Sequence, residues 1–395
     1  MKFNSIKSLL CVTLCIASSH QILAQTLSTN EILGGKINTI NTAVPFLRID
    51  PDARSGAMGD IGIAISGDAN SIYWNTAKIP FAEKNTALSV TYTPWLKELV
   101  NDIFLADISA YKKLDDNQAI TASLRYFSLG SITFTDAQGH TLNNFNPREF
   151  TFGVGYSRKI AENFSTGVNL SYIYSNLAAG AFVSGVPIKA GTAAAADISF
   201  FYHKDTKFGK TKGDYNVGLT ISNIGNKITY TQSAENKDFI PTNMGLGAGI
   251  NFKFDDYNSL MFGGEINKLL VPTPDSAGLF RTKSVPSGIL GSFSDAPGGG
   301  REEFHELMFS AGTEYWYKNQ FAVRAGYFNE HSTKGNRKYI TAGVGIKYNV
   351  FGLNFSYLIP TSGQKNPLDN TLRFSLLFEF DKTKTQKTTT PTTTE

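Results

Sequence analysis

Apolar residues recur at every second position in one segment after another between about Thr86 and Phe380. The last segment sets Leu372, Phe374, Leu376, Phe378 and Phe380 on one side and Thr371, Arg373, Ser375 and Glu379 on the other. A period of two places alternate side chains on opposite faces of a β-strand. Each segment continues for about 9–13 residues, whereas soluble strands average about 5–6 and membrane-spanning strands need about 9–11. The pattern predicts long strands with one apolar face each.

The polar face of these segments indicates what surrounds the sheet. It is rich in Gly, Ser, Thr and Asn, and poor in the Lys and Glu residues that usually cover a sheet in water. Charged residues make up 18% of the chain, against roughly 25% in soluble domains, and aromatic residues make up 12%. A narrow lumen favours small polar groups, so we expect an all-β, antiparallel transmembrane β-barrel. A β-sandwich and a soluble lipid-binding barrel are the alternatives.

Connection lengths indicate a barrel of about fourteen strands, an even number as in bacterial single-chain barrels. Tight turns at 159–162, 255–256, 318–319 and 348–350 alternate with long connections at 131–147, 176–190, 225–241 and 271–301. Outer-membrane barrels have short periplasmic turns and longer outer loops. The basic segment 204–213 departs from this alternation, and we expect it to be a longer periplasmic connection.

The amino terminus has the order of a secretory signal peptide. Lys2 and Lys7 form a basic start, residues 9–17 an apolar core, and residues 22–24 a small-residue exit. We expect residues 1–24 to be cleaved on export to the cell outer membrane. Both cysteines, Cys11 and Cys15, fall in this leader, so the expected mature chain has no thiol for a disulfide or a metal.

The mature chain divides into three regions by composition. Residues 25–84 are not strand-like and are rich in Gly and Ala, so we expect a hatch, or plug, inside the barrel of residues 85–380. A periplasmic arm is the alternative for this region. Residues 381–395 are rich in Thr and Lys, and we expect them to form a disordered, solvated tail.

Two stretches of the hatch region are recognisable. Residues 46–60 read FLRIDPDARSGAMGD, and residues 74–77 read WNTA. Residues 54–62, followed by Asp68-Ala69 and the WNTA stretch, resemble the amino-terminal hatch of FadL-like outer-membrane proteins. The longer stretch of residues 46–60 is similar to the PorV family of the type IX secretion system in Bacteroidetes. FadL-like hatches usually read Asn-Pro-Ala where this chain has Thr76 in the middle position. The candidate hatch signature is Arg54, Gly56, Met58, Gly59, Asp60, Asp68 and Asn75.

The resemblance implies a binding and transfer role without a reaction or a cofactor. It implies that the protein binds cargo carrying a C-terminal secretion signal and passes it from the translocon barrel to the surface sortase, or attachment complex. The implied partners are therefore the cargo, the translocon, the sortase complex and outer-membrane lipid. The alternative function is a FadL-like channel for uptake of hydrophobic small molecules, because both kinds of protein have the barrel and the hatch.

Apolar side chains in the expected outer loops are candidates for binding a partner. They are Trp95, Leu96, Leu99, Leu279, Phe280, Ile289, Leu290 and Phe293. The alternatives are that these side chains pack on one another over the barrel mouth or enter the outer leaflet.

Charged residues on the expected lumenal face form a second set. They are Arg125, Asp197, Glu265, Glu314, Arg324 and Arg373. We expect them to form ion pairs that hold the hatch, because buried charges are usually paired. Such pairs favour a plugged lumen over an apolar path.

The sequence does not favour an enzyme, a metal site or a nucleic-acid partner. The histidines outside the leader are scattered, and no Gly-x-Ser-x-Gly elbow precedes a helix. Glu302, His305 and Glu306 have loose metal-ligand spacing, but on the expected strand His305 would face away from both carboxylates. The net charge of +4 forms no basic stripe for nucleic acid. A barrel hydrolase acting on lipid remains an alternative.

Overall fold

The computed structural model describes residues 37–96, 102–135, 138–180, 182–183, 186–231, 237–275, 278–362 and 370–381. The expected signal peptide (1–24), Leu99 and the expected tail beyond Asp381 lie outside the described residues. Those expectations remain predictions.

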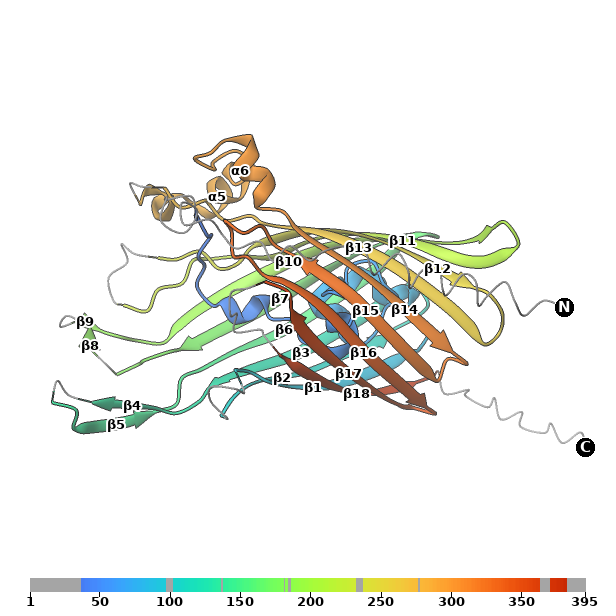
Figure 1. Cartoon of the computed structure of the whole chain (residues 1–395), viewed down its shortest axis with the longest axis horizontal. Coiled ribbons are helices and arrows are strands. Elements are labelled where there is room, and N and C mark those ends of the chain that lie inside the picture. The colour runs from blue at the N-terminus through green and yellow to red at the C-terminus, as the bar shows by residue number, and fades with distance from the viewer. Residues whose placement is uncertain are drawn as a thin grey trace, which may run out of the picture. The chain divides into compact units, whose positions relative to one another are not determined.

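Fourteen strands pair side by side into a closed barrel (Figure 1). They are β1 (Thr86–Pro94), β2 (Ile103–Lys113), β3 (Gln118–Leu129), β6 (Arg148–Ala161), β7 (Phe164–Asn176), β10 (Gly191–Phe208), β11 (Thr211–Gly225), β12 (Asn243–Lys253), β13 (Asn258–Leu269), β14 (Met308–Tyr317), β15 (Phe321–Asn329), β16 (Lys338–Tyr348), β17 (Phe351–Pro360) and β18 (Leu372–Phe380). The ring closes where β18 pairs antiparallel with β1, from Thr86 opposite Phe380 to Tyr92 opposite Phe374. Closure pairs every strand on both sides, which hydrocarbon requires because it offers no hydrogen-bond partner. The predicted fold class and strand number are confirmed.

Burial alternates along the strands in the direction that the sequence predicts. In β18, Phe374 and Leu376 are exposed on the outer face, whereas Arg373 and Ser375 are buried in the lumen. Removing such apolar surface from water is worth about 25 cal/mol per Å², so the outer face is suited to lipid. A soluble sandwich would bury that face instead, so this alternative is excluded.

Connections differ in length between the two ends of the barrel. One end, the turn end, has connections at 114–117, 162–163, 209–210, 254–257, 318–320 and 349–350. The other end, the loop end, has connections at 95–102, 130–147, 177–190, 226–242, 270–307, 330–337 and 361–371. In outer-membrane barrels, the end with the longer connections is the outer end.

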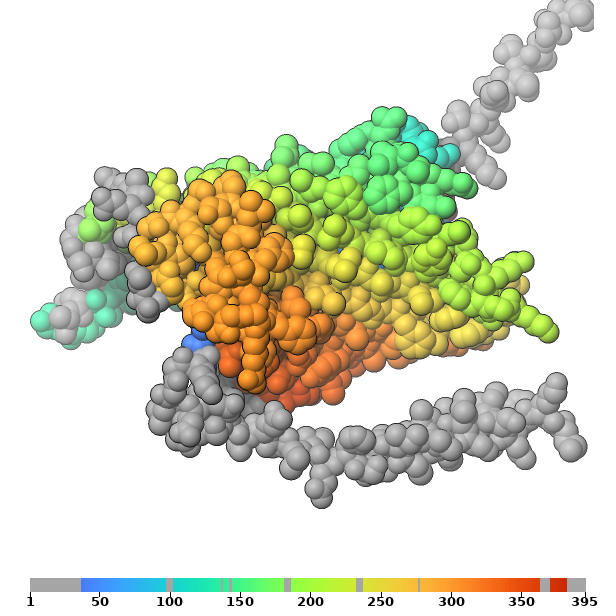
Figure 2. All heavy atoms as spheres, turned by 90° about the horizontal axis from the view of Figure 1, so that it is seen from above, coloured from blue at the N-terminus to red at the C-terminus, as the bar shows by residue number. Residues whose placement is uncertain are grey.

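Two small hairpins and three short helices lie within the long connections. The hairpins pair β4 (Ile132–Thr135) with β5 (Thr141–Phe145) and β8 (Phe182–Val183) with β9 (Val186–Pro187). The connection 270–307, which we call the cap, contains η3 (Leu279–Thr282), α5 (Val285–Gly291) and α6 (Gly300–His305). The cap projects at the loop end, in orange in Figure 2.

Two expectations about connections are wrong. The segment 204–213 is not a loop, because β10 and β11 stay paired as far as Phe208 opposite Thr211. Charged side chains do not interrupt backbone pairing, so charge was a misleading signal there. His305 ends a helix instead of lying at the start of a strand, and β14 begins at Met308. The acidic residues in the first turn of α6 favour a helix amino terminus.

The residues before β1 form short helical turns inside the barrel (Figure 1). These are η1 (Pro45–Arg48), α3 (Ala53–Gly56), α4 (Ser71–Trp74) and η2 (Thr76–Phe81). Helices this short are not stable alone, so tertiary contacts must hold them. The Asp52 carboxylate makes two such contacts, since it accepts hydrogen bonds from the Ser55 amide (2.9 Å) and the Trp74 indole (2.8 Å). Among the helices in the described ranges, none is long and apolar enough to cross a membrane.

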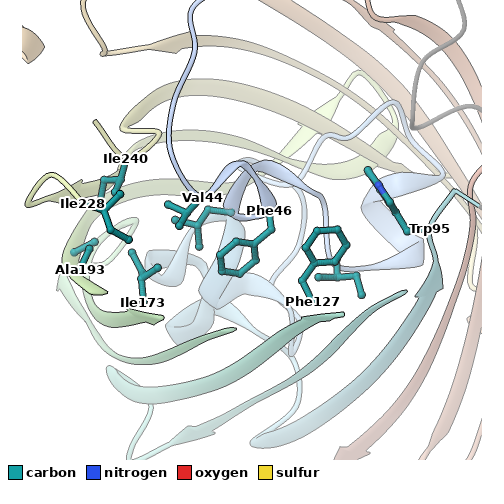
Figure 3. Close-up of a cluster of buried hydrophobic side chains, with 11 residues drawn as sticks. Val44, Phe46, Trp95, Phe127, Ile173, Ala193, Ile228 and Ile240 are labelled. Atoms are coloured by element: carbon teal, nitrogen blue, oxygen red, sulfur yellow. The ribbon is translucent and has the colours of Figure 1, made fainter. Parts of the chain in front are cut away.

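An apolar cluster, the mouth cluster, joins the hatch to the barrel wall at the loop end (Figure 3). Phe46 of the hatch stacks on Phe127 with ring centroids 6.3 Å apart, and Trp95 meets Phe127 edge-on at 6.2 Å. Trp95 is only 8% exposed. Trp95 is therefore not an exposed loop residue, because its indole packs against Phe127 of β3, and its role in partner binding stays a prediction.

Candidate functional site

The Arg54 guanidinium is the centre of the contact between hatch and wall. Its Nε and Nη2 donate to the two carboxylate oxygens of Glu314 on β14, at 3.0 and 2.7 Å. Its Nη1 donates to Asp68 of the hatch at 3.0 Å. Arg324 on β15 also pairs with Glu314, its Nε donating to the carboxylate at 2.6 Å. All four side chains are buried, and the bidentate pair with Glu314 fixes both the position and the orientation of α3.

Backbone contact between hatch and wall is closest at Met58 and Gly59. The Gly59 amide donates to the Thr341 hydroxyl at 2.7 Å, and Gly59 has a φ of +71°, which glycine adopts without strain. On the facing strands, a Cβ atom at Gly312 or Gly326 would overlap the backbone of Met58. Glycine at these wall positions therefore allows the two backbones to touch.

Asp60 and Gly56 meet the wall at β16 and β18. The Tyr339 hydroxyl donates to the Asp60 carboxylate, and the Arg373 guanidinium lies 3.6 Å from the same carboxylate. Arg373 also lies 4.0 Å from Asp50, and its side chain covers Gly56, where a Cβ atom would collide with it. A larger residue at this position of α3 would displace the arginine.

Asn75 fixes the inner half of the hatch to the opposite side of the barrel. Its amide nitrogen donates to the carbonyls of Ile63 (3.0 Å) and Phe200 on β10 (3.1 Å). Its amide oxygen accepts from the Ala77 amide at 3.0 Å. Thr76, which stands where FadL-like hatches have proline, donates its hydroxyl to Asn169 on β7 at 2.7 Å. The substitution therefore adds a wall contact that proline could not make.

Of the six lumenal charges, four contact the hatch directly. Glu314 and Arg373 do so as described, the Arg125 guanidinium donates to the Ile49 carbonyl at 3.2 Å, and Glu265 accepts from the Gly62 amide at 2.6 Å. Arg324 acts through Glu314. The expectation is wrong for Asp197 on β10, which instead accepts from Asn169 on β7 (3.2 Å) and the Asn223 amide on β11 (2.6 Å) and so links neighbouring strands.

A cavity of about 530 Å³ lies between the hatch and the loop end. One part of its lining is apolar and includes Phe46, Leu129 and the mouth-cluster residue Trp95. Another part is charged and includes Asp107 and Arg125, which pair at 3.2 Å. The lining therefore combines aromatic surface with fixed charges.

Buried lysines hold the cap on the barrel. Lys334, in the connection 330–337, donates to Glu302 (2.6 Å) and Glu306 (3.0 Å). Lys268 at the end of β13 donates to Glu303 (3.0 Å) and to Glu306 (2.5 Å). Although burial raises the pKa of Glu302, hydrogen bonds from Lys334 and the Gly298 amide outweigh it and keep that pKa below its usual value. Glu302 is thus ionised and paired with Lys334.

The rings of His305 and His331 stack where α6 meets the connection 330–337, with centroids 3.5 Å apart. Burial, with the charges of Arg301 and Lys334 nearby, lowers the pKa of His305, and burial together with His305 lowers the pKa of His331. A base with a lowered folded-state pKa stabilises the fold above its ordinary pKa of 6.5, and this contribution is lost as pH falls through the folded-state value.

We therefore expect protease cleavage of the cap to increase when the pH falls from 7.5 to about 5, because the stabilisation contributed by the two neutral imidazoles is then lost. Limited proteolysis of the folded barrel at both pH values measures this. A His305→Phe variant keeps a stacked ring without a titrating group, and its cleavage should change less with pH. Equal cleavage of the unmodified cap at both pH values would contradict the prediction.

The family model described as Type IX secretion system protein PorV matches residues 34–276, which include the hatch and the strands from β1 to β13. The chain belongs to the PorV family. Membership implies a component of the type IX secretion system, and it confirms the resemblance drawn from residues 46–60. A comparison with curated proteins finds no match.

Solved structures similar to this PorV-family chain include hydrocarbon channels and a FadL homologue. A deletion mutant of the TodX monoaromatic hydrocarbon channel has a TM-score of 0.50 at 12% identity, over 82% of this chain and 96% of that one. The toluene transporter TodX of P. putida gives 0.49 at 12% identity, over 85% and 100% of the two chains. A Pseudomonas aeruginosa FadL homologue gives 0.42 at 10% identity, over 87% and 100%. At such identities the likeness to the first of these shows the fold alone, an outer-membrane type of β-barrel.

The remaining loop candidates of this PorV-family chain fall in different environments. Leu96 is half-buried against the mouth cluster. In the cap, Leu279, Leu290 and Phe293 are exposed, with Leu290 at 75%, whereas Phe280 and Ile289 are half-buried. Phe304 on α6 is also exposed. Sequence reasoning missed it because the surrounding residues were assigned to a strand.

Glu302, His305 and Glu306, the residues with loose metal-ligand spacing, have other partners in the structure. Within the ranges described, no three His, Asp or Glu side chains are arranged to hold a metal ion. Glu302 and Glu306 are instead paired with lysines, and His305 is stacked on His331. The family and the FadL-like channels are generally transport proteins without a reaction.

Proposed function

We propose that this protein binds secreted cargo carrying a C-terminal signal at the outer surface and passes it from the translocon barrel to the sortase, or attachment complex. Membership of the PorV family makes the protein a component of the type IX secretion system, and the proposed role is one step of that system. It requires a barrel that acts as a docking platform and a loop surface that binds protein.

The bonding of the hatch to the barrel wall is the observation that supports this proposal. The hatch is bonded to strands around the ring, through Ser109 on β2, Asn169 on β7, Phe200 on β10, Glu265 on β13, Glu314 on β14, Thr341 on β16 and Ser375 on β18. Breaking even one buried charge pair costs about 3–5 kcal/mol, so a hatch held at this many points is a fixed element. A fixed plug favours binding at the surface over passage through the lumen.

The cap supplies a surface of the kind that proteins bind. Leu279, Leu290 and Phe293 expose apolar side chains on a connection that ion pairs hold in place. Exposed apolar groups on a fixed loop mark interaction sites, and binding energy at such sites is concentrated in a few residues.

We expect Leu290→Asp and Phe293→Asp to weaken binding of a cargo signal domain at least 10-fold. Each change removes apolar contact and places a charge in the interface, and a residue that dominates an interface contributes about 2 kcal/mol or more. The dissociation constant of the purified barrel for an isolated signal domain measures the effect. Ser294→Asp adds the same charge at an exposed polar position beside Phe293 and should bind normally. Normal binding by both apolar variants would contradict this docking surface.

The cavity favours a second candidate function, uptake of a hydrophobic small molecule. Its apolar lining could bind such a molecule, although the charges of Asp107 and Arg125 are close by. A deletion strain separates the two functions. Loss of surface-protein export with normal uptake supports the cargo carrier, whereas normal export with reduced uptake supports the channel.

A further inference from the structure

The first described residues, 37–43, form a strap across the loop end of the barrel. The Asn38 amide donates to the Thr333 carbonyl at 3.0 Å, and its side chain donates to the carbonyl of Pro274 and to Glu302, both at 3.2 Å. The Ala43 amide donates to the Phe239 carbonyl at 2.9 Å. The strap thus touches three long connections, 226–242, the cap and 330–337.

The other end of the hatch lies at the turn end. The Lys84 carbonyl accepts a hydrogen bond from the Tyr111 hydroxyl at 3.0 Å, near the carboxyl end of β2. The Asn85 amide donates to the carbonyl of Phe380, the last residue of β18, at 3.0 Å. The chain before β1 therefore runs through the lumen from one end of the barrel to the other. Figure 1 shows this path in blue, from the level of α5 and α6 down into the barrel.

We infer that the strap is displayed on the outer side of the membrane, so that the chain enters its own barrel from the cell exterior. The strap lies at the end with the long connections, which is the outer end of such barrels. Ile37 is 49% exposed and Asn41 is also exposed. In Figure 2 a blue patch of the first described residues lies at the surface beside the orange cap.

Cysteine labelling on intact cells tests the display. Cys11 and Cys15, the two cysteines of the chain, are replaced by serine, and a single cysteine is introduced as Ile37→Cys. Controls carry Leu290→Cys in the cap or Asp256→Cys in a turn of the turn end, both exposed positions. A membrane-impermeant maleimide should label the Ile37→Cys and Leu290→Cys proteins on intact cells, and the Asp256→Cys protein only after permeabilisation.

Two labelling patterns would overturn the inference that the strap is displayed outside. Labelling of Ile37→Cys only after permeabilisation, as at Asp256→Cys, places the strap inside and overturns it. No labelling in either condition means a covered strap and overturns it as well. Heat-modified migration on gels confirms that each variant is folded. Asn41→Cys, a second exposed strap position, replaces Ile37→Cys if that variant does not accumulate. Cargo binding is not measured, so the outcome is independent of the proposed function.

Discussion

Replacing Arg54 with alanine should lower the free energy of unfolding by about 3–5 kcal/mol, the usual cost of removing one partner from a buried ion pair. Glu314 would keep Arg324 as a partner, but Asp68 would lose its ion pair with Arg54 while remaining buried. Denaturant unfolding of the barrel in lipid vesicles measures the loss. Because the change loosens the hatch more than the ring, planar-bilayer recordings should also show channel openings that the unmodified barrel lacks.

The matched variant for this experiment is Arg54→Lys. Lysine keeps the positive charge but cannot form two parallel hydrogen bonds with Glu314, so its loss of stability should fall between the unmodified protein and the alanine variant. An Arg54→Ala barrel that unfolds at the unmodified denaturant concentration and stays closed in the bilayer would show that the ion pairs do not hold the hatch.

Replacing Gly326 with alanine should destabilise the hatch by about 1–3 kcal/mol or more, the range for overpacking in a tight interior. The added methyl group would overlap the backbone of Met58 and Gly59, and neither backbone can rotate away as a side chain could. Unfolding measurements and protease cleavage of the hatch report the effect.

Gly264→Ala is the control for this clash. Gly264 lies on β13 of the same barrel, and a Cβ atom there would have the Ser310 carbonyl oxygen as its nearest neighbour, at an ordinary 3.6 Å. This variant should unfold like the unmodified protein. If Gly326→Ala does the same, the hatch does not touch the wall at that point.

The barrel could be predicted from sequence because strand alternation is a local property. The period-two pattern of residues such as Phe374 and Ser375 is preserved in the ring, and the even strand number follows from the alternation of short and long connections. Connection length was less predictable, as in 204–213, because backbone pairing continues through charged residues and only the partner strand shows where it stops.

For the hatch, the sequence predicted the type of contact but not the individual partners. Inward charges such as Glu314 indicated ion pairs, but which hatch residue meets which strand depends on how the short helices fold. Asp197 illustrates the limit, because its partners Asn169 and Asn223 lie on the neighbouring strands β7 and β11 and not in the hatch. The environment of Trp95 was unpredictable for a related reason, since an apolar loop residue is exposed or buried according to what lies beneath it.

The carboxyl-terminal part of β10 pairs with a neighbouring strand on one side only. It pairs with β7 only from Gly191 to Tyr202, whereas its pairing with β11 continues to Phe208. Unpaired backbone groups of this kind can template strand addition by another chain, which leads to aggregation. Lys204, Asp205 and Lys207 lie along this edge, and bringing a second strand against it would crowd their charges. The charged residues of this segment thus disfavour the pairing of another chain with the exposed edge of β10, where the β10–β11 hairpin extends beyond the ring.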